Sequence, residues 1–328
     1  MSEIALLFRH KIMGRNSIEN VLKPLERFPG INRIELPYDL NSLFNAFRLI
    51  NFSFGIKEKN IHITGDVHYM AAFLFWKKSI ITVHDCNHYE QLHGLRKFLY
   101  GLIWFRLPFF FSNQIVAISP FTKSQLRQHF NVPERKIHVI PNAISKDVTK
   151  KHRTVDYFDR TFTILVIGTS HNKNIERLIL AVSNQENLQL DIVGKLGNSI
   201  IELMRTHNIS YVNSYGIPKS TLKKKYLASD LLFFASTKEG FGLPILEAQN
   251  YGLPVISSTT TSMPYVAGEG AILVNPYDID SIRKAIKEVR SNADLRLELV
   301  QKGYQNLNRF NVNVFVNEYR SLYSKIFN

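Results

Sequence analysis

The chain has 328 residues, of which 45% are hydrophobic and 21% charged, and this composition excludes a mainly disordered protein. The length exceeds one ordinary hydrophobic core and predicts two domains of about 150 residues each. A single cysteine, Cys86, excludes an internal disulfide and suits a reducing compartment. We expect a cytoplasmic protein, because the first residues lack a secretion-signal pattern and no stretch has the roughly 18–20 apolar residues of a spanning helix.

The chain carries a net charge of +14, and the basic excess is largest in its first part. Residues 1–150 contain 20 Lys and Arg against 11 Asp and Glu, whereas residues 151–328 contain 21 against 16. This balance favours an anionic partner, namely nucleic acid, acidic lipid or a phosphorylated substrate, and a lysine-rich surface without a specific partner is the alternative. Because no RNP-type, zinc-ligand or helix-turn-helix pattern accompanies the charge, we do not expect nucleic-acid binding.

The first 150 residues read as alternating strands and helices. A helix is expected after Asn16 or Ser17, and another over 120–130 with Ser119 as its N-cap. Short apolar runs predict strands within 4–8, 60–69, 79–86, 114–119 and 136–143.

Polar side chains fall at the carboxyl ends of two of these expected strands. In parallel sheets ligands gather beyond such ends. A histidine in this position is also a common structural hydrogen bonder, so both interpretations stay open, and the spacing does not match a zinc site. The residues concerned are Asp66, His68, His84 and Asp85.

Residues 95–107 form an aromatic and basic segment of helix length, and apolar character continues to Phe111. The rings and cations of 96–111 suit a membrane surface. A helix packed against the core of the first domain is the alternative.

A polar stretch at 145–160 is the best candidate for a linker, after which the pattern restarts. Asn174 is expected to cap the first helix of this second series. Two strand–helix series predict an α/β protein with two Rossmann-like parallel-sheet domains facing a cleft. The expected parts are a first domain over 1–150, a second domain over 151–309, and a C-terminal helix over 310–328 that returns to the first domain.

The segment 236–248 is the most informative stretch. It follows an apolar run at 230–235, contains two glycines and enters a helix at Pro244. A strand, a tight glycine turn and a helix start aim N–H groups and the positive helix end at one point, which suits a phosphate. Two carboxylates, Glu239 and Glu247, flank the turn with seven residues between them.

Residues 239–248 read Glu-Gly-Phe-Gly-Leu-Pro-Ile-Leu-Glu-Ala and resemble the Glu-x7-Glu signature of retaining family-4 glycosyltransferases (glycosyl transferases group 1) of the GT-B fold, as found in bacterial surface-polysaccharide and lipopolysaccharide synthesis. The chain is similar to this family also at 168–181, 252–256 and 271–276, so the resemblance covers most of the second domain. In the first domain it is thinner and rests on 139–143, Val-Ile-Pro-Asn-Ala, where the family has a final glycine.

The resemblance implies the transfer of a hexose from a nucleotide-diphosphate sugar, with retention at the anomeric carbon and without a metal. It implies catalytic roles for three residues: Glu239 beside the sugar hydroxyls, Lys173 at the diphosphate and His84 on the acceptor side. Glu247 is implied to accept hydrogen bonds from the ribose. The implied donor-binding residues are Gly14, Gly168, Thr169, Lys173, Lys195, Glu239, Gly240, Phe241, Gly242, Leu243 and Glu247.

These residue types suit the chemistry. Departure of a diphosphate places negative charge on the leaving group, and without a metal a lysine, amides and a helix end must stabilise it. We do not expect Glu239 to be a covalent nucleophile, unlike the paired carboxylates of a retaining hydrolase.

The chain departs from the family pattern at three positions. Thr169 and Asn172 stand where many relatives have an arginine, so Lys195 is a candidate for a second cation at the diphosphate. Tyr265 stands where the family has a glutamate.

Simpler explanations exist for single residues. Glu247 can favour the positive end of its helix by about 0.3–1 kcal/mol, and Lys173 can be a solvated first-turn residue. The alternatives for the whole chain are a non-catalytic nucleotide-sugar binder and another GT-B enzyme such as an epimerase. The expected partners are a nucleotide-sugar donor, a glycan or lipid-linked glycan acceptor and, peripherally, an anionic membrane at its inner face; no cofactor or metal is expected.

Overall fold

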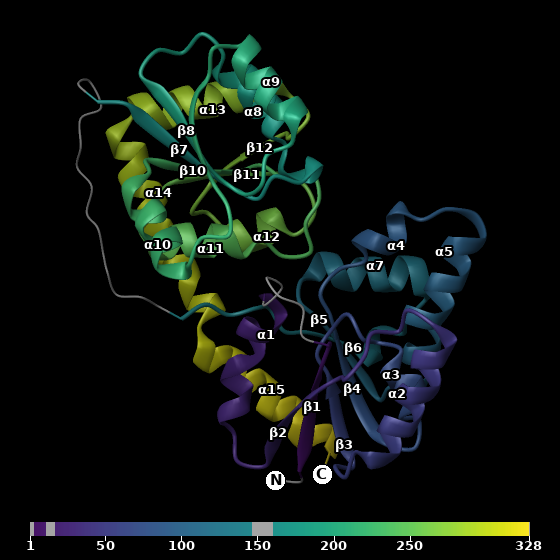
Figure 1. Ribbon diagram of the computed structural model, residues 1–328. Coiled ribbons are helices and arrows are strands. Elements are labelled where there is room, and N and C mark those ends of the chain that lie inside the picture. Colours follow the sequence, from purple (N-terminus) through teal and green to yellow (C-terminus); the bar gives the residue numbers. More distant parts are fainter. Residues whose placement is uncertain (1–2, 11–16, 146–159, 328) are drawn as a thin grey trace. The chain divides into compact units, whose positions relative to one another are not determined.

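The computed structural model describes residues 3–10, 17–145 and 160–327. Gly14 and most of the expected linker lie outside these residues. The chain divides into two compact units (Figure 1). The first unit comprises Met1–Ala143 and Val312–Asn328, and the second comprises Ile144–Asn311.

The first unit is built on a six-stranded sheet in which every neighbouring pair is parallel, with the order β2-β1-β3-β4-β5-β6. Its inner strands are largely buried on both faces, as in a sheet covered by helices on both sides. The strands are β1 (Ile4–Phe8), β2 (Ile31–Glu35), β3 (Asn60–Ile63), β4 (Lys78–Val83), β5 (Gln114–Ala117) and β6 (Ile137–Val139).

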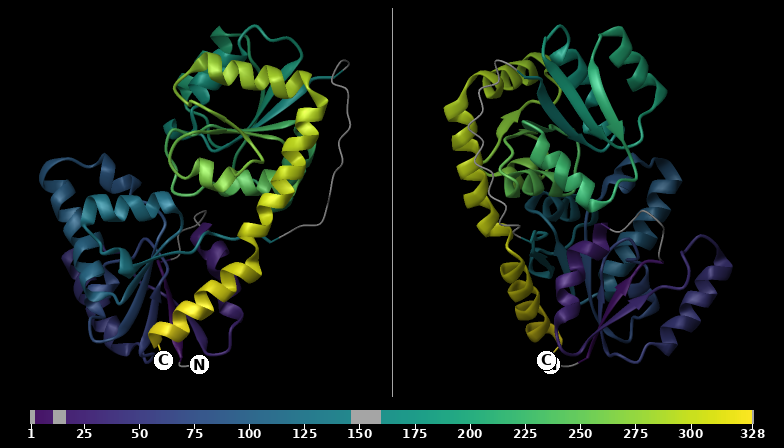
Figure 2. Two further views of the ribbon diagram at one scale, coloured as in Figure 1. Left: turned by 180° about the vertical axis from the view of Figure 1, so that it is seen from behind. Right: turned by 60° about the vertical axis from the view of Figure 1, so that its left-hand side comes forward.

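Helices cover both faces of this sheet. One face carries α2, α3, α6 and α7, whose buried side chains join one core cluster with the strands (Figure 1). The other face carries α1 and α15 (Figure 2). The helices are α1 (Ser17–Leu22), η1 (Lys23–Arg27), α2 (Leu43–Gly55), α3 (Met70–Phe73), α4 (Asn87–Gln91), α5 (Gly94–Gly101), the π-helical turn η2 (Leu102–Arg106), α6 (Leu107–Phe111), α7 (Pro120–Phe130), η3 (Glu134–Lys136) and α15 (Val312–Phe327).

The C-terminal helix α15 is held on the first unit by a buried polar network. The Tyr323 hydroxyl lies 2.6 Å from Nδ1 of His62 on β3, and Nε2 of His62 lies 2.7 Å from the Thr82 hydroxyl on β4. The Tyr319 hydroxyl lies 2.9 Å from the same Thr82 oxygen. All four side chains are buried, so each polar atom depends on this network for its hydrogen bonds.

The second unit repeats the architecture with a second parallel six-stranded sheet, in the order β12-β11-β10-β7-β8-β9. Helices α8, α9 and α13 pack on one face and α10, α11 and α12 on the other (Figures 1 and 2). The strands are β7 (Phe162–Ile167), β8 (Leu188–Val193), β9 (Ser210–Ser214), β10 (Leu231–Phe234), β11 (Val255–Ser258) and β12 (Ile272–Val274). The helices are η4 (His171–Lys173), α8 (Ile175–Val182), α9 (Asn198–Thr206), α10 (Lys219–Ala228), α11 (Leu243–Asn250), α12 (Met263–Ala267), α13 (Ile279–Ser291), α14 (Ala293–Asn306) and η5 (Leu307–Phe310).

The predicted pair of parallel-sheet domains is confirmed, and so is the Ser119 cap, whose hydroxyl accepts from the Thr122 amide at 3.0 Å. Asn174 occupies the N-cap position of α8, as predicted, but its side chain makes no capping hydrogen bond. Its backbone is left-handed (φ +63°), and its side chain instead donates to the carbonyl groups of Ala235 and Pro276. The segment 95–107 is helical but is interrupted by a π-helical turn.

The buried imidazole of His62 makes the stability of the first unit dependent on pH. Burial, together with the nearby His84, lowers the pKa of His62 from 6.5 to about 3. The unfolded chain therefore binds this proton at a higher pH than the folded chain does. The stabilisation is complete above about pH 6.5 and is lost as the pH falls towards 3.

We predict that His62→Gln reduces this dependence. Between pH 7 and pH 5 the wild type is expected to lose about 2 kcal/mol more unfolding free energy than the variant, measured by denaturant unfolding at both pH values. His68 is unchanged in both proteins and so cancels in the comparison. Equal losses of unfolding free energy in the two proteins would contradict the lowered pKa of His62.

Candidate functional site

The loops that follow β7 and β10 meet at one edge of the second sheet. The two strands are parallel neighbours, so their carboxyl ends lie side by side. The Thr237 amide donates to the Asn172 carbonyl at 2.9 Å and joins the two loops. Thus residues 168–174 and 235–242, far apart in sequence, form one continuous surface.

An ion pair between Lys173 and Glu239 occupies this junction. Lys173 Nζ lies 2.6 Å from Glu239 Oε1, and each side chain is 17% exposed. The same oxygen accepts a hydrogen bond from the Asn172 side-chain amide at 3.0 Å. Lys173 Nζ also lies 4.5 Å from the centre of the Phe234 ring, a cation–π distance. Two residues predicted to act on the donor are therefore in direct contact.

Asn172 fastens this pair to the backbone. Its amide also donates to the Lys238 carbonyl at 2.8 Å, and its own side-chain oxygen accepts from the Ser170 hydroxyl at 2.6 Å. Sequence reasoning noted Asn172 only as a missing arginine. Its role in holding Glu239 depends on a contact across 67 positions of sequence, which no local pattern signals.

Glycines allow the close approach of these loops. Gly168 has φ +88°, and a Cβ there would lie 2.7 Å from Cε of Lys173. Gly194 has φ +149°, and a Cβ there would lie 2.6 Å from Thr169, whose hydroxyl donates to the Lys195 carbonyl at 2.7 Å. The loops that carry Thr169 and Lys195 are therefore adjacent to each other.

The loop after β11 holds the turn of 240–243 in place. The Ser262 hydroxyl donates to the Phe241 carbonyl at 2.8 Å, and the Phe241 ring is buried. Gly242 has φ +114° and directly precedes α11, and its carbonyl accepts a hydrogen bond from the Ile245 N–H at 3.0 Å. Thr261, a β-branched residue, is held at φ +59°, a strained conformation of the kind found at binding sites.

Glu247 lies in different surroundings from Glu239. Its Oε2 accepts a hydrogen bond of 2.6 Å from the hydroxyl of Tyr226 on α10. Burial raises the pKa of Glu247, while the Tyr226 hydrogen bond and the charge of Lys219 act in the opposite direction. The two carboxylates of the motif are thus distinct, since one is paired with a cation and the other with a buried phenol.

His84 lies in the first unit, at the end of β4. Its Nε2 donates to the Thr64 carbonyl at 2.8 Å, and burial lowers its pKa, so the imidazole is neutral at pH 7. Gly65 makes room for it, because a Cβ there would lie 2.4 Å from the His84 ring. The other predicted site residues belong to the second unit, except Gly14, which lies outside the described residues.

The remaining strand-end residues of the first unit have mainly structural partners. Asp66 forms an ion pair with Arg9 at 2.5 Å, and Arg9 also pairs with Glu19 at 3.0 Å. His68 is buried between the carbonyl groups of Trp104 and Thr82, and burial lowers its pKa to about 4.

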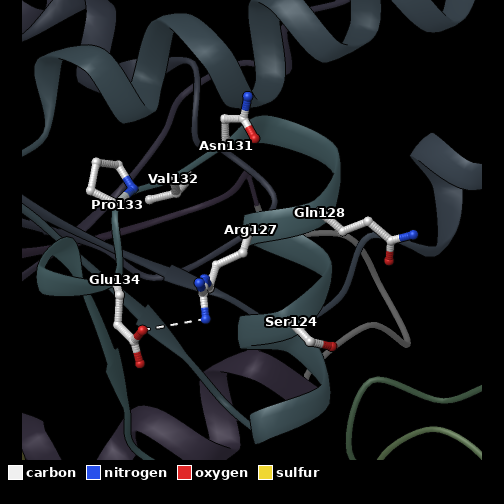
Figure 3. Close-up of a pocket in the computed structure, with 7 residues that line it drawn as sticks. All are labelled: Ser124, Arg127, Gln128, Asn131, Val132, Pro133 and Glu134. Carbon is white, nitrogen blue, oxygen red and sulfur yellow. Dashed lines mark ion pairs between the residues drawn. The ribbon is translucent and has the colours of Figure 1, made fainter.

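A hollow on the first unit lies apart from all predicted site residues. It is formed by the end of α7 and the chain that follows, where Arg127 and Glu134 form an ion pair at 3.3 Å (Figure 3). Its lining contains no predicted donor or acceptor residue. Within residues 3–10, 17–145 and 160–327 no group of three or more His, Cys, Asp or Glu side chains could hold a metal ion. None of the helices in the described part of the chain is long and apolar enough to cross a membrane.

The fold is similar to that of several solved structures. Anabaena Alr3699/HepE in complex with UDP-glucose has a TM-score of 0.77 at 13% identity, covering 98% of this chain and 99% of that chain. WaaG, a glycosyltransferase involved in lipopolysaccharide biosynthesis, has a TM-score of 0.69 at 13% identity, covering 97% and 99%. At these identities the likeness shows the fold, and the predicted GT-B class is confirmed.

Curated relatives are similar over parts of the chain. RfbU of Salmonella typhimurium, an O-antigen chain mannosyltransferase, is 26% identical over 249 residues, which are 73% of this chain and 68% of that protein. The O-antigen chain mannosyltransferase B of Escherichia coli is 27% identical over 186 residues, 51% of this chain and about half, 49%, of that protein.

The fold is that of the GT-B class, and matches to two family models show the class of protein. The family model described as Glycosyltransferase Family 4 matches residues 15–148, and the model described as Glycosyl transferases group 1 matches residues 148–306. The chain belongs to this family of glycosyltransferases.

We predict that Gly242→Ala destabilises the second unit. A Cβ at this position would lie 2.8 Å from Cε of Met263 in a backbone conformation that alanine disfavours, which costs about 1–3 kcal/mol. Thermal unfolding should show a lowered melting temperature. Gly55→Ala is the matched control, since no atom lies within 4 Å of its added Cβ, and it should be neutral or slightly stabilising. Equal melting temperatures for both variants would contradict the strain argument.

Proposed function

We propose that the chain is a retaining, metal-independent glycosyltransferase that moves a hexose, mannose, from a nucleotide-diphosphate sugar to a glycan or lipid-linked glycan acceptor. The proposed setting is surface-polysaccharide synthesis in the cytoplasm, at the inner face of the membrane. The choice of mannose and of surface-polysaccharide synthesis is supported by the names of RfbU and the O-antigen chain mannosyltransferase B.

The observation that carries the proposal is the cluster of Lys173, Glu239 and Asn172 beside the start of α11. A leaving diphosphate gains negative charge, and a partly buried ammonium group stabilises that charge more strongly than a solvated one does. The positive end of α11 adds a second stabilising element. On donor binding, Lys173 shares its charge between Glu239 and the distal phosphate.

The hydrogen bonds of Glu239 favour a binding role over a nucleophilic one. Both Lys173 and Asn172 donate to Oε1, so the lone pairs of that oxygen already accept hydrogen bonds. Among the residues that the structure describes, Oε2 has no partner, and it can accept hydrogen bonds from hydroxyls of the sugar. Retention then proceeds without a glycosyl–enzyme bond, and a neutral His84 is a hydrogen-bonding group for the acceptor side.

Glu247 is proposed to bind the ribose. The Tyr226 hydroxyl engages Oε2, which leaves the second oxygen to accept from ribose hydroxyls. Burial favours the neutral form of this carboxyl, and a hydrogen bond from the ligand to the carboxylate counteracts that effect.

We predict donor-specific thermal stabilisation. A ligand that binds only the folded state raises the melting temperature by mass action, so a screen of GDP, UDP, dTDP and ADP and their sugars identifies the donor. The preferred nucleotide-linked mannose should then be consumed only with acceptor, at an unchanged rate in the presence of a chelator. NMR of the product should show the anomeric configuration of the donor. Loss of turnover with chelator, or an inverted product, would contradict the proposal.

We predict that Lys173→Ala and Glu239→Gln each lower kcat by about 10²–10³-fold, as removal of a charge-stabilising donor does. Lys225→Ala is the matched control, because its ion pair with Asp191 has the same length, 2.6 Å, and similar burial but lies between α10 and β8. That variant should retain its activity. A non-catalytic nucleotide-sugar binder would instead show donor binding in the wild type with no turnover for either variant to lose.

A further inference from the structure

The helical segment α5–η2–α6 presents an apolar stripe to solvent. Its inward side packs against the protein, since Phe105 and Phe109 are buried in the core of the first unit. The outward side chains recur every three or four residues along the segment, and Phe110 at its end is 77% exposed. The exposed members are Leu95, Phe98, Leu99, Ile103, Leu107 and Phe110.

Helix α2 likewise exposes apolar side chains to solvent. It buries Leu49 and Ser53 against the first unit and exposes large apolar side chains on its outer side, of which Leu43 is 83% exposed. A surface helix of a monomeric protein ordinarily carries polar residues there. The exposed members are Leu43, Phe44, Phe47 and Phe54.

A chain of aromatic contacts joins the two stripes. Phe54 stacks on Trp76 with 4.9 Å between ring centres, and Trp76 contacts Phe75 at 5.1 Å. Phe75 contacts Phe111 at 6.0 Å, and Phe111 contacts Phe110 at 5.1 Å. The stripes of α2 and α5–η2–α6 and this bridge form one continuous surface of the first unit, called here the apolar face. Contiguous exposed apolar surface of this extent marks an interaction site.

The charges around the apolar face have one sign over a long stretch. Residues 91–111, which include all of α5–η2–α6, contain three basic residues, Arg96, Lys97 and Arg106, and no Asp or Glu. Arg96 and Arg106 are exposed within the α5–η2–α6 stripe, and Arg48 on α2 lies over the rings of Tyr38 and Phe44 at 3.6 and 5.3 Å. Aromatic rings with interleaved cations match the boundary between acyl chains and anionic head groups.

We propose that the apolar face docks the first unit onto the surface of an anionic lipid bilayer. The rings enter the level of the head groups, and the basic side chains extend to lipid phosphates. The proposal deepens the proposed function, because a lipid-linked acceptor is presented at such a surface. Its observations include no residue of the donor site.

A second copy of this chain is the competing occupant of the apolar face. An isologous contact would place Arg96, Arg106 and Arg48 of both copies at the same interface with no acidic residue from 91–111 to neutralise them. Such like-charge contact is unfavourable, whereas an anionic lipid surface neutralises the same side chains. The charge pattern therefore favours the bilayer.

The test is co-sedimentation of the full-length chain with vesicles of phosphatidylcholine alone or mixed with phosphatidylglycerol. We expect binding to the mixed vesicles, weaker binding to neutral ones, and a decrease as salt is raised. Phe47→Ser and Phe110→Ser should each weaken binding roughly tenfold or more. Arg96→Gln and Arg106→Gln should each weaken it about fivefold. Tyr215→Ser is the matched control, an aromatic residue of the second unit exposed to 67%, against 69% for Phe47.

Equal binding to both vesicle types, or binding that none of the four variants weakens, would overturn the proposal. The proposal would also be overturned if the protein does not bind vesicles but dimerises with increasing concentration in analytical ultracentrifugation, and if Phe110→Ser abolishes that dimerisation. These substitutions lie on the surface and should leave the melting temperature unchanged. The donor screen is done without lipid, so vesicle binding without any donor shift would contradict the proposed function alone.

Discussion

The ion pair between Lys173 and Glu239 is the interaction on which the donor half of the molecule depends. A partly buried pair gains little stability by itself, because desolvation offsets the Coulomb attraction, so it persists only where neighbouring groups hold its geometry. Here Asn172 supplies a second donor to the carboxylate, and Gly168 removes the Cβ that would collide with the lysine chain. The parallel pairing of β7 and β10 brings both loops to one edge. The strand pairing, the glycine backbone and the hydrogen bond from Asn172 thus all hold the same ion pair in place.

The two carboxylates of the glycine-turn motif have different physical environments, although their spacing alone makes them look equivalent. Glu239 faces a cation and an amide, and Glu247 faces a buried phenol on α10. An ionised oxygen beside Lys173 suits contact with sugar hydroxyls near the leaving phosphate. A carboxyl whose pKa is raised by burial suits a site where the ligand completes its hydrogen bonds. In our proposals, donor chemistry therefore belongs to the second unit, and lipid contact belongs to the apolar face of the first unit.

Much of the fold could be predicted from the sequence, because buried parallel strands are continuous apolar runs and helix starts such as Ser119 carry local signals. The expectations omitted several elements, among them β2, α2, α9 and α14. In β2, polar residues interrupt the apolar run, as at Asn32 and Arg33, and α2 exposes phenylalanine on its outer side, so neither has the usual apolar periodicity. Asn174 was assigned to a cap by residue type, whereas its amide is used to join two strand-end loops.

The sequence by itself determined the family, the presence of two parallel sheets and the glycine turn with its paired carboxylates, because each is encoded in residues close together in the chain. Only the tertiary structure decided which groups meet. The contacts of Glu239 with Lys173 and Asn172, of Glu247 with Tyr226 and of His62 with Tyr323 join residues separated by 21 to 261 positions. Strand order and helix packing bring such distant residues into contact. The hydrogen bonds and the electrostatic surroundings of each group follow from these contacts.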